Sequence, residues 1–332
     1  MSVTIKDIAK EVGVSHITVS RALNNNPNVT VATKAKVMEA AKRLHYTPNM
    51  NAKSLVLKRS FTIGLFFTSI SNGMSPEIFY QLVEKCNRDV NKDYNIIVKG
   101  IDNLNSINQI AQTNFDGIIL FSQSSKDASF VQEVKARNIP LVIINKQTED
   151  IFSISFNEQK GGYIILKELL KNNHKRIAFL MGNESSASTA SRLKGYNKCL
   201  EEYAINAENC IFRYGDYSYD NGHKIAKALI KDEEKFTAIC CQNDDMAIGA
   251  IKAMKEMGLS VPGNISVCGY DGTNVAAMFD PSITTVRRPI LLALELAMTK
   301  LFDLINGSTS EGNKNIMLEP ELIDGKSIKH IE

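Results

Sequence analysis

The first sixty residues contain two short segments whose apolar positions recur at helical spacing. One segment covers residues 5–12 and the other residues 19–23. Gly13 lies between them, where a residue without a Cβ allows the chain to turn sharply. Two short helices joined in this way are typical of a helix-turn-helix, whose second helix lies in the major groove of DNA. The pattern therefore predicts a DNA-binding head.

Polar residues stand where these helices would begin. Thr4 can cap the first helix, with Asp7 as its reciprocal partner, and Ser15 can cap the second. A third helix is predicted over residues 31–44, with Thr30 as its cap. The apolar positions that this third helix is expected to contribute to the core of the head are Ala35, Val37, Met38, Ala41 and Leu44.

From residue 61 onward the chain alternates between apolar strand-like runs and amphipathic helical patterns. The strand-like runs are FTIGLFFTSI, YNIIVKGID, DGIILFSQ, PLVIINK, RIAFLMG, FTAICCQN, ISVCGYD and ITTVRRP. The helical patterns include PEIFYQLVEKCNRDV, KGGYIILKELLKNNH and DDMAIGAIKAMKEMG. Continuous apolar strands separated by helices predict parallel sheets that are covered on both faces. Two such sheets with a cleft between them fit a chain of 332 residues.

Charge is distributed unevenly between these two parts. Residues 1–60 contain ten Lys and Arg but three Asp and Glu, which gives a charge of +7. The whole chain has 39 basic and 36 acidic residues and a net charge of +3, so the remainder carries −4. A basic head favours binding to phosphates, because neutralised phosphates release their counterions. The same asymmetry argues against a small helical hairpin that has no partner.

Composition and cysteine spacing narrow the class of protein further. The chain is 44% apolar and 23% charged, which is ordinary for a soluble globular protein. The start MSVTIKD has no signal-peptide pattern, and no apolar run reaches the roughly 20 residues that span a bilayer, so a cytoplasmic protein is expected. Six cysteines are scattered without metal-ligand spacing. Reduced, buried thiols are therefore expected, and no catalytic residue, metal site or cofactor is predicted.

Several motifs occur together in the first seventy residues. TIKDIAKEVGVS is followed by TVSRALN, then by a third helix ending in RLHYTPN, then by an A-x-S-L pattern and the strand IGLFF. With these motifs the chain resembles the LacI/GalR family of transcriptional repressors, and the resemblance extends over essentially the whole chain. It implies an α/β fold with an all-α head. In such a fold a helix-turn-helix DNA-binding domain and a hinge helix precede a periplasmic-binding-protein-like core of two doubly wound parallel-sheet subdomains.

The resemblance also implies domain boundaries and an oligomeric state. We expect the helix-turn-helix domain at residues 1–47, the hinge helix or linker at 48–60 and the effector-binding and dimerisation core at 61–332. Within the core, the N-subdomain is expected near 61–160 and 291–321 and the C-subdomain near 161–290. The chain stops after LEPELIDGKSIKHIE without the leucine heptads of tetrameric members, so a homodimer on a pseudo-palindromic operator is expected.

On the DNA side, three residues occupy the specificity positions of the family's recognition helix. Arg21 suits bidentate contact with guanine, although a phosphate contact remains an alternative, and Ile17 suits a thymine methyl group. His16 can accept, donate or stack. The resemblance further implies that Leu55 of the hinge helix enters the minor groove, where an inserted apolar side chain bends the duplex. The remaining expected DNA contacts are Thr4, Ser15, Ser20, Asn24, Asn49, Ala52 and Lys53.

On the effector side, the resemblance implies a ligand in the cleft between the subdomains. Arg192 matches the family's ligand-binding arginine, Asp271 its acid at the end of a strand, and Tyr217 an aromatic that stacks on a ring. Asp244 is expected to cap the following helix instead. The other expected effector contacts are Ser69, Ser71, Met74, Asn145, Phe156 and Asn243.

Phe156 departs from the Asp-Asn pair that the family often has before the Gly-Gly of KGG. An apolar ring at this place favours an effector with an apolar or stacking face, such as a sugar.

The expected function is a dimeric repressor of a carbohydrate-utilisation operon, controlled by a sugar or sugar phosphate. Two alternatives within the family stay open: a catabolite-type regulator controlled by a phosphorylated carrier protein, and a repressor that responds to a purine or nucleoside. A solute-binding protein would share the core, but the basic head and the missing signal peptide argue against it. The chain has no G-x-S-x-G, P-loop or H-E-x-x-H motif, so an enzyme is not expected.

Overall fold

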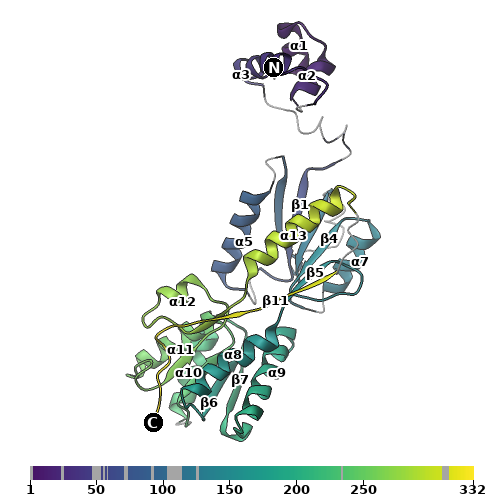
Figure 1. The fold of residues 1–332 in the computed structure, drawn as a ribbon. Coiled ribbons are helices and arrows are strands. Elements are labelled where there is room, and N and C mark those ends of the chain that lie inside the picture. The colour runs from purple at the N-terminus through teal and green to yellow at the C-terminus, as the bar shows by residue number, and fades with distance from the viewer. Residues whose placement is uncertain are drawn as a thin grey trace. The chain divides into compact units, whose positions relative to one another are not determined.

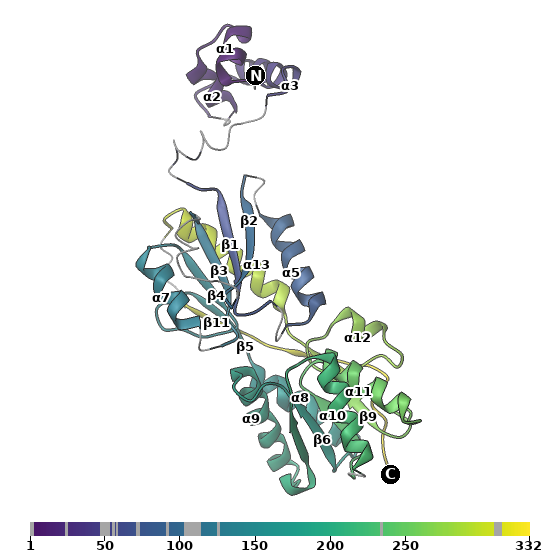
Figure 2. The ribbon, with the colours of Figure 1, turned by 180° about the vertical axis from the view of Figure 1, so that it is seen from behind.

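The computed structural model of the protein describes residues 3–23, 26–46, 54, 57, 59–70, 74–90, 93–102, 114–124, 127–232, 235–308 and 314–332. The chain forms two compact units, residues 1–60 and residues 61–332. Figure 1 labels the helices and strands, and Figure 2 shows the same ribbon from behind.

In the described part of the first unit, three helices have defined bounds: α1 (Ile5–Val12), α2 (His16–Leu23) and α3 (Val31–Arg43). Ile8, Val19 and Val37, one from each helix, are fully buried against one another in a small core. These residues are the apolar positions that helical spacing selects, so the predicted helical head is confirmed.

Two of the core positions predicted on α3 are wrong. Ala35 is exposed, and Met38 is 56% exposed. The predicted positions Val37 and Ala41 are buried, and Ala40 is buried as well. These three positions follow the three- and four-residue spacing of one helix face, which leaves Ala35 on the opposite side and Met38 beyond the edge of that face.

The second unit contains two lobes. The N-lobe is a six-stranded parallel sheet in the order β11-β5-β4-β3-β1-β2, together with helices α5, α7 and α13. Its strands are β1 (Thr62–Phe67), β2 (Asn95–Gly100), β3 (Gly117–Phe121), β4 (Leu141–Ile144), β5 (Ser153–Phe156) and β11 (Asn315–Leu318). Its helices are α5 (Pro76–Asp89), α7 (Ala128–Ala136) and α13 (Ile290–Ile305).

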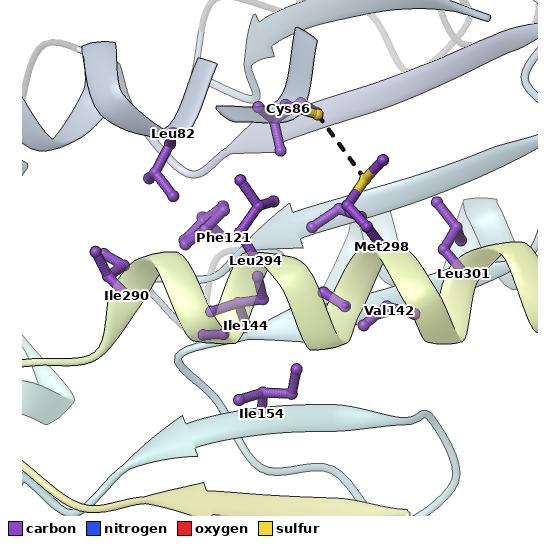
Figure 3. Packing of buried hydrophobic residues seen from close by; sticks show 14 of the residues in the cluster. Leu82, Cys86, Phe121, Val142, Ile144, Ile154, Ile290, Leu294, Met298 and Leu301 are labelled. Carbon is purple, nitrogen blue, oxygen red and sulfur yellow. Dashed lines mark hydrogen bonds between the residues drawn. The ribbon is translucent and has the colours of Figure 1, made fainter. Parts of the chain in front are cut away.

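Helices cover both faces of the N-lobe sheet. Helices α5 and α13 lie on one face, where Leu82, Leu294 and Leu301 pack against Phe121 and Val142 of the central strands, as Figure 3 shows. Helix α7 covers the opposite face. Because strand side chains alternate between the two faces, a strand buried on both must be apolar throughout. The burial of every residue of β3 and β4 meets this requirement.

The C-lobe is a four-stranded parallel sheet in the order β7-β6-β8-β9, covered by α8 and α9 on one face and by α10 and α11 on the other. Its strands are β6 (Ile177–Met181), β7 (Ile211–Tyr214), β8 (Ala238–Cys241) and β9 (Ser266–Cys268). Its helices are α8 (Glu158–Lys171), α9 (Ala187–Glu202), α10 (Tyr219–Lys231), α11 (Asp244–Glu256) and α12 (Asn274–Met278), with a 3-10 turn η2 (Ala207–Asn209). Strands β10 (Thr285–Arg287) and β12 (Glu321–Ile323) form a separate two-stranded ladder.

The prediction of two parallel sheets is confirmed, but the strand assignment was incomplete. The run ITTVRRP forms β10, which pairs antiparallel with β12 instead of joining a parallel sheet. Strands β5, β7, β11 and β12 were not predicted. β5 reads Ser-Ile-Ser-Phe, and β7 and β11 are edge strands with polar residues, so none of them is a continuous apolar run.

The chain passes between the lobes three times: after β5, before α13 and after β11. The N-lobe is therefore built from two separated stretches of sequence, whereas the elements of the C-lobe from α8 to α12 are consecutive. The exact domain boundaries expected from the sequence stay a prediction.

Candidate functional site

Residues at the start of each helix, together with Gly13 in the turn between them, fix the helix-turn-helix. The Asp7 carboxylate accepts hydrogen bonds from the Thr4 backbone N–H at 2.8 Å and from the Thr4 hydroxyl at 2.7 Å, and the bond from the hydroxyl lowers the pKa of Asp7 most. The Ser15 hydroxyl accepts a hydrogen bond from the Thr18 N–H at 3.1 Å. Gly13 has a φ of 74°, in the left-handed region that glycine tolerates. These contacts define where α1 begins and ends and where α2 begins.

Helix α2 has one buried face and one exposed face. Val19 and Ala22 are buried in the head, whereas His16, Ile17 and Arg21 are exposed. Ile17 is 52% exposed, although it is a large apolar residue on a helix of a small domain. The exposed face thus presents a cation, an imidazole and an aliphatic side chain, which suit guanine, polar base edges and a thymine methyl group respectively.

The other expected DNA contacts are of two kinds. Thr4 and Ser15 take part in the contacts at the two helix starts, and Ser20 is half-buried on α2. The rest, together with most of the expected hinge helix, lie outside the described residues: Asn24, Asn49, Ala52, Lys53 and Leu55.

A cavity of about 460 Å³ lies between the N-lobe and the C-lobe. Its walls come from the ends of strands and from the loops that follow them, where open α/β sheets bind ligands. Eight of the nine residues expected to contact an effector line it, and Ser71 lies outside the described residues. The eight are Ser69, Met74, Asn145, Phe156, Arg192, Tyr217, Asn243 and Asp271.

Two arginines and two carboxylates form a buried chain of ion pairs beside this cavity. Arg192 Nε donates to Glu158 Oε2 at 2.7 Å, and Arg288 Nη1 lies 3.5 Å from Glu158 Oε1. Arg288 Nη2 also donates to Asp271 Oδ1 at 2.5 Å. The Arg192 guanidinium lies 3.7 Å from the centroid of the Tyr270 ring. Glu158 therefore connects the two guanidinium groups, and Asp271 compensates the second of them.

Burial and charge act in opposite directions on this chain of ion pairs. Burial alone would raise the pKa of Glu158, but the adjacent guanidinium groups of Arg192 and Arg288 outweigh it and hold this pKa below its ordinary value. Burial likewise opposes the charge of Arg192, whereas the Glu158 carboxylate keeps the pKa of Arg192 well above its ordinary value. Both partners are consequently charged at neutral pH.

Tyr217 is held in the cavity wall by three neighbours. Its hydroxyl forms a 2.6 Å hydrogen bond with the Thr189 hydroxyl, and its backbone carbonyl accepts from Asn243 Nδ2 at 2.8 Å. Its ring lies on Gly182, where an added Cβ would come within 1.9 Å of the ring. Tyr217 also has a φ of 68°, a strained conformation that persists only when the surroundings impose it. The aromatic face is therefore fixed before any ligand arrives.

The amide groups of the two expected asparagine contacts are already engaged within the protein. Asn243 Oδ1 accepts from the Met246 N–H at 2.9 Å, so Asn243 caps α11, while its Nδ2 donates to Tyr217. Asn145 Nδ2 donates to the Ser122 carbonyl at 3.0 Å. Both residues line the cavity, and Asn243 additionally fixes the position of Tyr217.

The expectation that Asp244 caps the following helix is wrong. Asn243 occupies the cap, and Asp244 is the first residue inside α11, fully buried. Its carboxyl accepts from the Thr273 N–H at 2.8 Å and from the Thr285 hydroxyl at 2.6 Å, so it joins α11 to α12 and β10. Burial, reinforced by the charge of Asp271, raises the pKa of Asp244 to about 7.

Sequence reasoning missed Glu158 and Arg288. Both stand where the chain crosses between lobes: Glu158 follows β5 at the start of α8, and Arg288 follows β10 just before α13. The Arg288 guanidinium also lies over the Phe156 ring, 5.5 Å from its centroid. The apolar ring that was predicted to face the effector therefore has a cation next to it. The signal available in the sequence was a charged residue directly beside each predicted crossover.

Cysteines, possible metal ligands and possible membrane spans are the other candidate features of the described chain. All six cysteines are free, and five are buried as expected, whereas Cys210 is only half-buried. Burial raises the pKa of the Cys86 and Cys199 thiols to about 12, which keeps them protonated. Within the described parts of the chain, no three His, Cys, Asp or Glu residues are grouped so that they could hold a metal ion. None of the helices in those parts is long and apolar enough to span a membrane.

Comparison with known proteins agrees with this arrangement. A family model described as "Bacterial regulatory proteins, lacI family" matches residues 4–49, and one described as "Periplasmic binding protein-like domain" matches residues 166–328. The probable HTH-type transcriptional repressor ExuR of Bacillus subtilis is 39% identical over 331 residues, which cover 99% of both chains. The chain belongs to the LacI family.

Two further LacI-family proteins extend the comparison. Catabolite control protein A of Priestia megaterium is 33% identical over 94% of this chain and 96% of its own length. A crystal structure of the lac repressor dimer bound to operator and the anti-inducer ONPF superposes with a TM-score of 0.82 at 28% identity, covering 99% of this chain and 100% of that chain. The predicted family and fold class are confirmed. The protein is a LacI-family transcriptional repressor with a DNA-binding head, and it is not an enzyme.

Proposed function

We propose that this LacI-family repressor acts as a homodimer on a pseudo-palindromic operator of a carbohydrate-utilisation operon. A sugar or sugar phosphate bound in the 460 Å³ cavity controls its affinity for the operator. Binding shifts the population between two relative positions of the lobes, and one of these positions favours DNA binding. An effector that binds both positions equally well does not change the affinity for the operator. The effector must therefore distinguish the two positions, which it can do by contacting both lobes.

The observation that carries this proposal is the composition of the cavity wall. Hydroxyl, amide and carboxyl groups from both lobes surround a fixed aromatic face, that of Tyr217. Glu158 and Asp271 already neutralise the two guanidinium groups, so the wall offers many hydrogen-bond partners without a strong excess of positive charge. A ligand with several hydroxyl groups and one stacking face fits this chemistry, and the volume lies in the usual range for small-molecule sites.

The proposed homodimer is supported by a related protein. The related lac repressor structure is itself described as a dimer.

A melting screen tests the effector. The full-length protein is heated in a calorimeter with single mono- and disaccharides, sugar phosphates, purines and nucleosides. A ligand that binds only the native state stabilises it by about 2.7 kcal/mol at a hundred times its dissociation constant, so a true effector is readily detected. We expect one sugar class to raise the melting temperature, and Tyr217→Leu to abolish the shift. Tyr214→Leu removes a neighbouring tyrosine that does not line the cavity, and it should leave the shift unchanged.

The screen also separates the alternatives. A shift with purines or nucleosides alone would replace the sugar by a purine effector, and relatives named PurR are among the similar proteins. No shift with any compound would contradict the small-molecule proposal. It would favour control by a phosphorylated carrier protein, an alternative that the similarity to catabolite control protein A keeps in view.

A further inference from the structure

The first turn of α5 in the N-lobe touches the C-lobe directly. Glu77 Oε1 accepts a hydrogen bond from the Asn274 N–H at 2.8 Å, and Glu77 Oε2 accepts one from the Val275 N–H at 3.1 Å. Asn274 and Val275 are the first two residues of α12, which belongs to the C-lobe. One carboxylate therefore holds two backbone donors of the opposite lobe.

Neighbouring residues hold this carboxylate in place and add a second contact. Gln81, one helical turn along α5, donates its Nε2 to Glu77 Oε1 at 2.7 Å. Ser75, which is buried just before α5, hydrogen-bonds to the Asp245 carboxyl on α11. The N-lobe thus contacts both α11 and α12 through residues at one end of α5. Charge-assisted hydrogen bonds of the Glu77 kind are stronger than neutral ones.

In each lobe, the residue that makes this contact is close in sequence to a residue that lines the cavity. Met74 lines the cavity from the N-lobe and precedes Glu77 by three residues. Asp271 lines it from the C-lobe and precedes Asn274 by three residues. A change in the relative position of the lobes must therefore alter the Glu77 contact and the cavity wall together.

We propose that the Glu77 carboxylate is a latch that holds the lobes together beside the cavity and fixes their relative position. Loss of the carboxylate releases the α12 amides and lets the lobes separate at this edge. The consequence for effector retention rests on the proposed function, whereas the latch itself is a property of the chain without ligand or DNA.

The test therefore uses the full-length protein with neither. Hydrogen–deuterium exchange reports the Asn274 and Val275 amides. Spin labels on Gln132→Cys in α7 and Lys194→Cys in α9, both exposed positions, report the distance between the lobes. In Glu77→Ala we expect exchange at the two amides to accelerate about 5- to 30-fold, the factor that one or two kcal/mol represents, and the interlobe distance distribution to broaden. Glu77→Gln keeps one acceptor atom and should fall between this variant and the wild type.

Glu84→Ala is the matched control, because it removes an exposed carboxylate of the same helix that lies outside the contact. It should reproduce the wild-type exchange and distances. Faster exchange in Glu77→Ala with an unchanged distance distribution would overturn the latch and leave Glu77 as a local cap of α12. Equal effects of Glu77→Ala and Glu84→Ala would overturn it as well. Gln81→Ala keeps the carboxylate but frees it, and should change both readouts less and in the same direction. A failed effector screen alters none of these outcomes.

Discussion

The buried ion pairs beside the cavity give a quantitative prediction for Glu158→Gln. The substitution keeps the size of the side chain and removes the negative charge that lies 2.7 Å from Arg192 and 3.5 Å from Arg288. Arg288 keeps Asp271 as an ion-pair partner. Arg192, in contrast, loses the only ion-pair partner that it has among the described residues. Arg192 is 2% exposed and cannot move its charge into water without rearranging α9.

The expected loss follows from charge and burial. Two unit charges about 4 Å apart interact by about 4 kcal/mol at an effective dielectric constant of about 20. Breaking one partner of a buried pair costs about 3–5 kcal/mol in other proteins, because it leaves an uncompensated buried charge. We therefore expect Glu158→Gln to lower the free energy of unfolding of the second unit by about 3–5 kcal/mol at pH 7.

Urea denaturation followed by far-UV circular dichroism measures this loss, since the chain has no tryptophan to report unfolding by fluorescence. Glu133→Gln is the control: it breaks the pair with Arg137, a 2.6 Å contact in which both side chains are about one-third exposed, and should cost less than about 1 kcal/mol. The double variant Glu158→Gln/Arg192→Met should recover part of the loss, because it removes the stranded charge.

The pH dependence supplies an independent check. The pKa of Glu158 is lowered in the folded protein, so its contribution is present above the unfolded pKa of about 4.3 and is lost as pH falls through the folded value. The difference between wild type and Glu158→Gln should therefore shrink in acid. A variant within about 1 kcal/mol of wild type at pH 7 would refute the reasoning, because the surface-pair range would then apply to this buried pair.

Three other residues carry predictions of the same kind. The pKa of Asp244 is raised to about 7 in the folded protein, so its protonated carboxyl stabilises the fold fully below about pH 4, and this contribution is lost as pH rises through 7. The stability of the wild type should therefore fall by about 2–3 kcal/mol between pH 5 and pH 8 relative to Asp244→Asn, as measured in paired urea titrations. Gly195→Ala would bring a Cβ within 2.0 Å of the Gln159 carbonyl oxygen where α8 and α9 touch, and should lower the free energy of unfolding by about 1–3 kcal/mol or more. As a control, Lys194→Ala at the exposed neighbouring position should change the free energy of unfolding by less than about 0.5 kcal/mol. Arg21→Ala should weaken binding to the specific operator by about 1–3 kcal/mol and leave binding to random duplex DNA nearly unchanged in fluorescence anisotropy; an equal loss on both DNAs would assign Arg21 to phosphate contact instead.

The local parts of the fold were the most predictable from sequence. The positions of Ile8 and Val19 reflect helical spacing within a few residues, and the caps at Ser15 and Thr30 are formed by residues three apart. Met38 was misplaced because an apolar residue at one edge of a helix face cannot be assigned to the core without its neighbours. Strands β7 and β11 were missed for a related reason, since each lies at the edge of its sheet and contains polar residues that interrupt its apolar run.

The cavity was predictable only where the family resemblance supplied positions. Arg192, Tyr217 and Asp271 were expected there and line it, although their roles toward an effector stay proposals. Glu158 and Arg288 were not expected, because their importance comes from contacts between residues far apart in the chain. No spacing rule within the sequence indicates that Glu158 and Arg288 form an ion pair.

The divided N-lobe also constrains how the protein can form during synthesis. Helix α13 supplies Leu294, Ala297 and Leu301 to the N-lobe core, and Leu301 lies over Gly117 so closely that an added Cβ would come within 2.8 Å of it. Strands β3 and β4, which it covers, leave the ribosome about 150 to 170 residues before α13 begins, with that apolar face open. The consecutive elements of the C-lobe emerge in between, so the later lobe can complete its core before the earlier one. A nascent chain stalled before residue 290 should therefore expose the N-lobe sheet to chaperones.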